Sequence, residues 1–268
     1  MRLVLILTLF CAACAWAGVD DDWKDQFSQA SRAAALKDFP TAETAYAKAL
    51  KSAEIFGKDD KRVASTVQGR ANLFRAEKKL GEAEEDARRA LAIYIVSPGE
   101  KSMEFGETQF ILTGILMDEG KFDGALDAVR RALPILEQNL GPNASAVEDA
   151  TCALGAVYVQ LKRYASAEAP LKRCADMRAD DGGVSTAEFG EVAFSLAVVF
   201  QRLGNLSDSE KYFTLAEHIR EQSLGISSPV FADTLEAHAS LLRQLGREDD
   251  AKKNERMAAS IRALNKKK

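Results

Sequence analysis

Small residues along the chain recur with a period of about 42 residues. The first row of them follows each predicted turn, with one step of 41 residues and then four steps of 42 residues. Its members are Ala42, Ala83, Ala125, Ala167, Ser209 and Ala251. A fixed period of this length predicts stacked supersecondary units rather than one globular core.

Two further rows of small residues keep the same period. The row seven residues later consists of Ala49, Ala90, Ala132, Cys174, Ala216 and Ala258. The row twelve residues earlier consists of Ala30, Ala71, Thr113, Gly155, Ala197 and Ala239. Large apolar residues mostly stand three and nine residues before the first row, and such spacings place residues on one helical face. Each unit is therefore predicted to be two antiparallel helices joined by a tight turn.

The residue at the end of each predicted first helix bears on how the turns close. Glycine, which readily takes the left-handed conformation needed there, stands at Gly120, Gly204 and Gly246. Lysine holds the place in the other units, at Lys37, Lys78 and Lys162. We expect those three turns to close in a different way.

The repeat pattern resembles that of tetratricopeptide-repeat proteins, in the longer unit of kinesin light chain-like arrays. Residues 120–142 and 162–179 resemble that subtype closely. The resemblance implies an all-α fold, a right-handed α-solenoid of about six repeats. We place the repeats at residues 23–60, 64–100, 106–142, 148–184, 190–226 and 232–268. A HEAT-type array has a similar period, but the paired small residues favour tetratricopeptide repeats.

The first seventeen residues have a different pattern. Arg2 is followed by an almost entirely apolar run to Trp16, and Ala15-Trp16-Ala17 is a small-x-small cleavage site. This pattern is typical of a secretory signal peptide, and the run is too short to cross a bilayer comfortably. We therefore expect a periplasmic or secreted protein, with residues 18–268 as the repeat array. The alternatives are an uncleaved anchor and an outer-membrane lipoprotein acylated at Cys14.

Length and charge limit the classes of function. Cleavage after Ala17 leaves 251 residues, which six units of 42 residues fill without room for a catalytic domain. Loss of Arg2 with the leader changes the net charge from −4 to −5, which argues against nucleic acid as the main ligand. We expect no membrane insertion of the mature chain, and a monomer.

Two cysteines remain after the predicted cleavage, Cys152 and Cys174. Cys174 holds a position that is alanine in the other five units, so the simpler interpretation is a small core residue. Oxidation to a disulfide in an exported protein is the alternative.

Residues that would support catalysis, a metal or a cofactor are scarce. His218 and His238 are the only histidines, and the mature sequence contains no zinc-binding, phosphate-binding or nucleophile-elbow motif. We predict no enzyme activity, no metal and no cofactor. His238 stands where three other units have leucine, which favours a core or capping role, and His218 is expected to face solvent.

The resemblance implies a binding site on the concave face, which the first helices line. The matching positions in the middle units are Phe110, Gly114, Met117, Cys152, Ala156, Val159, Phe194, Val198 and Gln201. This row is mostly apolar, and Arg75, Arg202 and Arg243 are predicted to flank it. The family usually carries an asparagine pair at its start, which this chain lacks, so we expect an apolar or aromatic-bearing peptide or protein. The alternative is that the phenylalanines pack between units.

A row of acidic residues also recurs, at Glu107, Asp149, Glu191 and Asp233. Each stands in the first turn of a predicted first helix, where a carboxylate complements the helix dipole. We prefer this structural explanation to a rim that binds cations or lysine. The sequence as a whole predicts an exported, non-enzymatic scaffold that binds a protein or peptide.

Overall fold

The computed structural model describes the backbone of residues 2–180 and 186–266 and the side chains of residues 18–179 and 186–266. This part of the chain forms twelve α-helices and no strand, so the predicted all-α class is confirmed. The helices are α1 (Arg2–Ala35), α2 (Phe39–Glu54), α3 (Lys61–Ala76), α4 (Leu80–Val96), α5 (Met103–Asp118), α6 (Phe122–Leu140), α7 (Ser145–Gln160), α8 (Tyr164–Asp180), α9 (Ala187–Arg202), α10 (Leu206–Leu224), α11 (Pro229–Gln244) and α12 (Glu248–Asn265).

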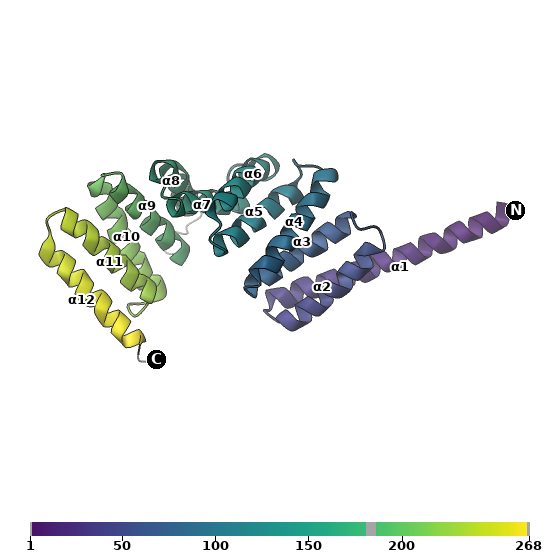
Figure 1. Ribbon diagram of the computed structural model, residues 1–268, viewed down its shortest axis with the longest axis horizontal. Helices are drawn as coiled ribbons and strands as arrows, with labels where there is room; N and C mark the ends of the chain where they lie inside the picture. The colour runs from purple at the N-terminus through teal and green to yellow at the C-terminus, as the bar shows by residue number, and fades with distance from the viewer. Residues whose placement is uncertain (1, 181–185, 267–268) are drawn as a thin grey trace. The chain divides into compact units, whose positions relative to one another are not determined.

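The chain consists of two compact units, Met1–Asn139 and Leu140–Lys268. Each unit is built from helical hairpins of consecutive helices, which Figure 1 shows as antiparallel pairs. Within the first unit α2 packs on α3 and α4 packs on α5; within the second, α8 packs on α9 and α10 packs on α11. Within each unit, successive hairpins thus contact one another, as the repeat period predicts.

The first helices from α3 onward begin three residues before the predicted repeat starts, and a side-chain cap marks the start of three of these five helices. Asp60, Ser102 and Thr186 precede α3, α5 and α9, and each side chain accepts a hydrogen bond from a backbone N–H of the first turn. Such caps satisfy donors that the helix itself leaves free.

All three rows of small residues are buried at the helix crossings, as predicted. A Cβ on Gly155 would lie 2.6 Å from the Leu171 side chain, so only glycine fits that crossing without a shift. Ser209, the one polar member of its row, is fully buried, and its hydroxyl donates to the Ala197 carbonyl at 2.8 Å. The hydrogen bond offsets the cost of burying that hydroxyl.

All six turns inside the hairpins close in the same way, so the expectation of two kinds of turn is wrong. The lysines adopt left-handed φ angles of 59°, 62° and 56°, beside 74°, 81° and 75° for the glycines. At Gly120 the N–H bonds to the Met117 carbonyl and the next N–H bonds to the Leu116 carbonyl, and the lysine turns repeat this pair of bonds. This is the Schellman motif. The two hydrogen bonds hold lysine in a conformation that its Cβ disfavours.

Candidate functional site

The predicted binding row in the first unit lies on α5 and is partly covered. Phe110, Gly114 and Met117 are all half-buried. The Arg75 guanidinium of α3 lies over Gly114, where an added Cβ would be 2.2 Å from its Nη1 atom. Arg75 Nε also donates to Asp118 of α5 at 3.1 Å. Arg75 therefore ties α3 to α5, rather than standing free beside the row as a ligand-binding cation.

A polar cluster adjoins this row. The Tyr94 hydroxyl lies 3.1 Å from Gln68 Oε1 and 3.2 Å from the Ser65 hydroxyl. Burial raises the pKa of Glu107, and the negative charge of Glu104 raises it further. A hydrogen bond with Gln68 lowers this pKa and so opposes part of the increase. Glu107 thus differs from the other members of the acidic row, which pair with arginines.

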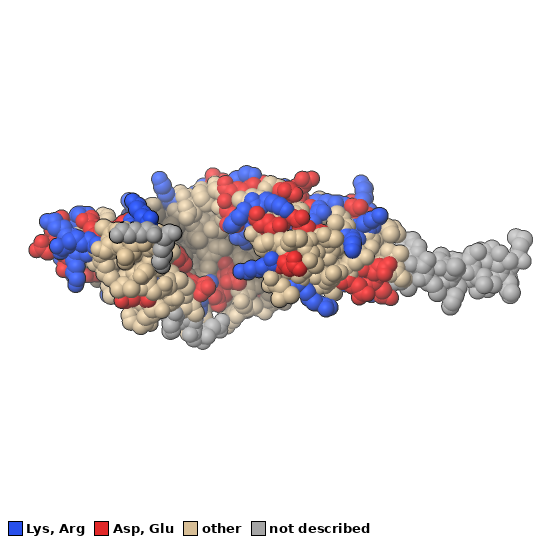
Figure 2. Space-filling model, turned by 90° about the horizontal axis from the view of Figure 1, so that it is seen from below, with Lys and Arg blue, Asp and Glu red and all other residues tan. Residues whose placement is uncertain are grey.

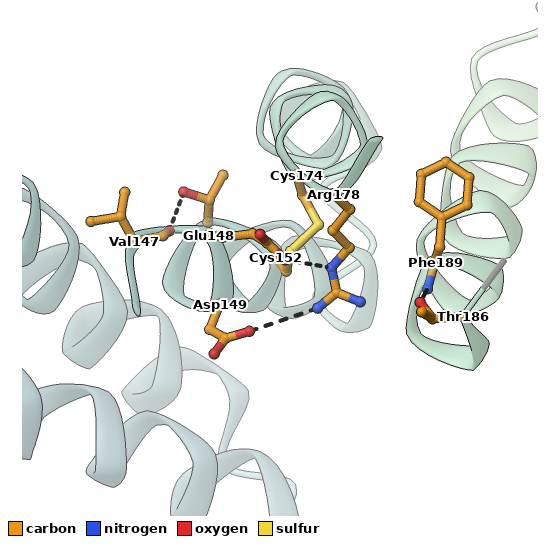
Figure 3. The surroundings of a disulfide bond; sticks show 9 residues. Val147, Glu148, Asp149, Cys152, Cys174, Arg178, Thr186 and Phe189 are labelled. Carbon is orange, nitrogen blue, oxygen red and sulfur yellow. Dashed lines mark hydrogen bonds and ion pairs between the residues drawn. A yellow bond between two sulfur atoms is a disulfide. The ribbon is translucent and has the colours of Figure 1, made fainter. Parts of the chain in front are cut away.

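In the second unit, Cys152 of α7 is joined to Cys174 of α8 by a disulfide, with 5.1 Å between the Cα atoms (Figure 3). The simpler interpretation of Cys174 as a core thiol is therefore wrong about its chemistry, although its side chain is fully buried as expected. The bond clamps the two helices of one hairpin. Ala156 and Val159 follow Cys152 on α7 and are half-buried.

Phe194 and Val198 of α9 pack into an apolar cluster with Phe213 and Leu241. The Phe194 and Phe213 rings meet edge to face, with 5.9 Å between centroids. The Arg220 guanidinium also lies over the Phe194 ring, 4.4 Å from its centroid. Phe194 therefore has the packing role that the sequence left open, although it is half-buried like Phe110.

The remaining predicted residues lie at different places in the second unit. Gln201 is half-buried near the end of α9, and the exposed Arg202 lies over the Tyr164 ring at 5.9 Å. Arg243 of α11 pairs with Glu255 at 2.5 Å and with Glu248 at 3.4 Å, both on α12. Arg243 is thus held by the last helix.

Arginines that sequence reasoning missed neutralise the acidic row in the second unit. Arg178 lies 3.7 Å from Asp149, Arg220 lies 2.8 Å from Glu191 and Arg262 lies 2.6 Å from Asp233. Figure 3 shows the Arg178 guanidinium directed toward Glu148 and Asp149, beside the disulfide. Each arginine stands four residues after a small residue of the second row, so its 42-residue period was visible in the sequence. The pairs link the two helices of each hairpin and leave no free acidic rim on them.

Arg220 is the most deeply buried of these arginines, with 2 % of its surface exposed. Its Nη1 donates to the Thr234 hydroxyl at 2.6 Å, while its Nε has no hydrogen-bond partner among the described residues. Burial lowers the pKa of Arg220, and the neighbouring Glu191 opposes that change. A buried guanidinium of this kind depends on its carboxylate partner.

His238 is buried in the core of the second unit, in line with the prediction for it. Its Nδ1 lies 2.7 Å from Glu217, and its ring stacks on Phe213 with 5.4 Å between centroids. His218 is exposed, also as expected. Among the residues with described side chains, no cluster of histidine, cysteine and acidic residues could hold a metal ion. Over the same residues, no helix is long and apolar enough to cross a membrane.

The surface charges are mixed in sign. In the view of Figure 2, blue and red side chains are interspersed over both units. Many are paired, and one set links successive hairpins: Glu43 with Lys79, Glu84 with Lys121, and Glu210 with Arg247. Mixed charge of this kind suits a solvated helix surface and gives no field of one sign to attract nucleic acid.

Comparisons with known proteins agree with the fold. The family model described as tetratricopeptide repeat matches residues 112–180. BtubC (BKLC) from P. vanneervenii is 18% identical with a TM-score of 0.64, over 91% of this chain and 92% of that protein.

Two further structures extend the comparison. RapI in its apo form is 18% identical with a TM-score of 0.66, over 92% of this chain and 99% of that one. The putative kinesin light chain TPR-like repeats of Podosopora anserina are 15% identical with a TM-score of 0.62, over 78% of this chain and 98% of that one. No curated protein matches the sequence. Identities this low show the fold alone.

The predicted resemblance to tetratricopeptide-repeat proteins, kinesin light chain-like repeats included, is confirmed. Proteins of this fold generally serve as non-enzymatic scaffolds for protein interactions.

Proposed function

We propose that this tetratricopeptide-repeat chain is an exported, non-enzymatic scaffold that binds a protein or peptide on the face lined by its first helices. The observation that carries the proposal is the row of half-buried apolar side chains on those helices. Phe110 and Met117 present such surface in the first unit, and Val159 does so in the second. An extended peptide or a partner helix would bury such surface on either unit.

We restrict the proposed site to these three residues, on the following contacts. Phe194 and Val198 are engaged in packing, Cys152 is in a disulfide, and Arg75 and Arg243 are held by carboxylates. We therefore assign binding to Phe110 and Met117 in the first unit and to Val159 in the second, each unit taken by itself, with Gln201 as a polar member of the same predicted row. Arg202 remains exposed and charged, and it is the predicted flanking cation that stays in our proposal.

The test is affinity capture of envelope proteins by the mature chain, compared with a Met117→Glu/Val159→Glu variant. Both substitutions replace half-buried apolar residues, so the variant is first matched to the parent by circular dichroism and thermal melting. The control is Ala259→Glu, an exposed position on α12. We expect a partner that the parent and control retain and the variant loses. A partner retained by all three proteins would contradict binding on this face.

Export is the second part of the proposal. The leader of residues 1–17 supports it, and so does the disulfide, because structural disulfides persist in oxidising compartments. The side chains of residues 1–17 lie outside the described residues. Intact-mass measurement of the chain recovered from an expressing cell should give a mature protein that begins at Gly18. A chain that keeps Met1 in the cytoplasm would contradict export.

A lipid-anchored assembly factor at an outer membrane is the alternative, because Cys14 follows two small residues in the leader. Cys14 also lies outside the described side chains. In that case the mature chain would begin at Cys14 and carry the mass of its acyl groups. A Cys14→Ala substitution would then release the protein from membranes, whereas it would leave a chain cleaved after Ala17 unchanged.

A further inference from the structure

A second surface of the first unit has the features of a docking groove. It is an open groove of about 400 Å³ between α4 and α6, with α5 as its floor. This volume falls in the range of sites that hold ligands or anchoring side chains. Every lining residue belongs to the first unit.

The floor of the groove is distinct from the predicted binding row. Gln109, Leu112 and Leu116 of α5 line it, spaced by three and four residues. At 3.6 residues per turn, these three lie on a different face of α5 from Phe110 and Met117. A ligand in the groove would therefore contact the side on which the second helices pack. The inference goes beyond the proposed function and does not rest on it.

A buried polar side chain lines the groove. Gln109 is 5 % exposed, and within the described part of the chain its side-chain amide has no hydrogen-bond partner. The amide atoms are not sealed from solvent, because Gln109 borders the open groove. The amide is therefore available as a donor and acceptor to a group bound in the groove.

The rim combines apolar surface with two charges that have no partner in the described chain. Ile95 of α4 is 46 % exposed at the rim, which is a high value for such an apolar side chain. Asp127 and Arg131 of α6 line the groove one helical turn apart, both exposed and both without an ion pair among the described residues. The other rim arginine, Arg88, is neutralised by Glu84 at 2.7 Å.

We infer that the groove between α4 and α6 docks an amphipathic helix of another protein. Its apolar stripe covers the exposed Ala92 and Ile95 of α4, above a floor of buried leucines. Along its edge a carboxylate meets Arg131 and a basic residue meets Asp127. Asp127 and Arg131 stand four residues apart on α6, which is about one helical turn. On a bound helix aligned with α6, the basic and acidic residues that pair with them therefore also stand one turn apart. This spacing, together with an apolar floor, is the recognition mode of a helix in a groove.

The inference is tested by selecting peptides from a displayed random library against the mature chain. The decisive variant is the charge swap Asp127→Arg/Arg131→Asp, which keeps the net charge and changes only exposed positions. The matched control is the swap Asp249→Lys/Lys253→Asp, an exposed acid–base pair with the same spacing on α12. Ala92→Trp, at an exposed position that lines the groove, serves as the blocking variant.

We expect selected peptides with apolar residues one turn apart, edged by one acidic and one basic residue. The swap variant should select the reverse order of charges and should bind the parent's peptides about tenfold more weakly. Ala92→Trp should abolish binding, and the α12 swap should leave it unchanged. No enrichment over Ala92→Trp, or peptides indifferent to the charge swap, would overturn the inference. A concentration-dependent dimer that Ala92→Trp abolishes would instead identify a second copy of this chain as the occupant.

Discussion

At the scale of single residues, the left-handed lysines have a direct energetic consequence. Lys37, Lys78 and Lys162 hold φ angles near 60° because the Schellman hydrogen bonds require them. A side chain with a Cβ is disfavoured there by roughly 1–2 kcal/mol relative to the right-handed conformation. Glycine does not carry that penalty, although it loses more conformational freedom on folding.

Lys162→Gly should therefore stabilise the second unit, by about 0.5–1 kcal/mol. The measurement is the free energy of unfolding by urea. Gly204→Ala, at the equivalent turn after α9, is the reciprocal control and should destabilise by a similar amount. A loss of stability in Lys162→Gly would show that the lysine makes a contact that outweighs its backbone conformation.

The buried Arg220 leads to a second prediction at this scale. Glu191→Gln leaves the guanidinium buried without a counter-charge, so it should lower the free energy of unfolding by about 1–3 kcal/mol. Arg220→Met in the same background should recover much of the loss, because the apolar side chain needs no partner. The comparison is a double-mutant cycle by urea denaturation. Equal losses in the single and double variants would contradict the pairing.

Glu107 should respond to pH in the opposite sense from a paired acid. Its pKa is raised in the folded state, so its ionised form is the less favoured one, and folding loses stability as the pH rises through the usual range near 4.5. Glu107→Gln should thus be more stable than the parent at pH 7 and about equal to it below pH 4. Thermal melting at both pH values checks this, with the exposed Glu221→Gln as control.

At the scale of helices, the disulfide is the main feature that the second unit has and the first lacks among the described residues. It closes a loop with a sequence separation of 22 residues and joins α7 to α8. In the chain-entropy model a loop of this length stabilises the folded state by about 3 kcal/mol. The neighbouring Arg178 ion pairs link the same two helices.

Reduction of Cys152–Cys174 should accordingly lower the free energy of unfolding by up to about 3 kcal/mol. The measurement is urea denaturation with and without dithiothreitol. A Cys152→Ala/Cys174→Ala variant, which restores the small residue found in the other repeats, should be insensitive to the reductant. A parent chain that is equally stable in both conditions would mean that the disulfide does not form in solution.

At the scale of the whole molecule, carboxylates dominate the response to acid. Hydrogen bonds and ion pairs with basic residues lower the pKa of Asp20, Glu43, Glu84, Asp118, Asp208, Glu236 and Glu255. A lowered pKa in the folded state contributes stability above the unfolded value, and that stability is lost as the pH falls.

We therefore expect the melting temperature to be nearly constant from pH 8 to pH 5 and to fall below about pH 4. Because these groups lie near the surface, high salt should weaken the dependence. Circular dichroism melts across this pH range at two salt concentrations test the prediction. A midpoint that rises on acidification would contradict it.

The sequence by itself determined the fold class and the position of every hairpin turn. Small residues that recur with a fixed period mark the places where two helix backbones approach closely, as at Gly155 and Ser209. The sequence also shows the 42-residue period of Arg178, Arg220 and Arg262, although their pairing with the acidic row was not predicted. Identical spacing in successive units fixed these features because each unit repeats one local arrangement.

Only the tertiary structure decided which side chains of a row face solvent and which bond to a neighbouring helix. Arg75 and Phe110 belong to the same predicted surface, yet Arg75 lies over Gly114 and reaches Asp118 from another repeat. Cys152 and Phe194 are likewise engaged by α8 and α10. The groove between α4 and α6 was also hidden, because three separate helices line it. Contacts between helices depend on the directions in which long side chains reach from one repeat to the next. The period of a sequence gives the spacing of residues along the chain, and it does not give the distances between side chains in space.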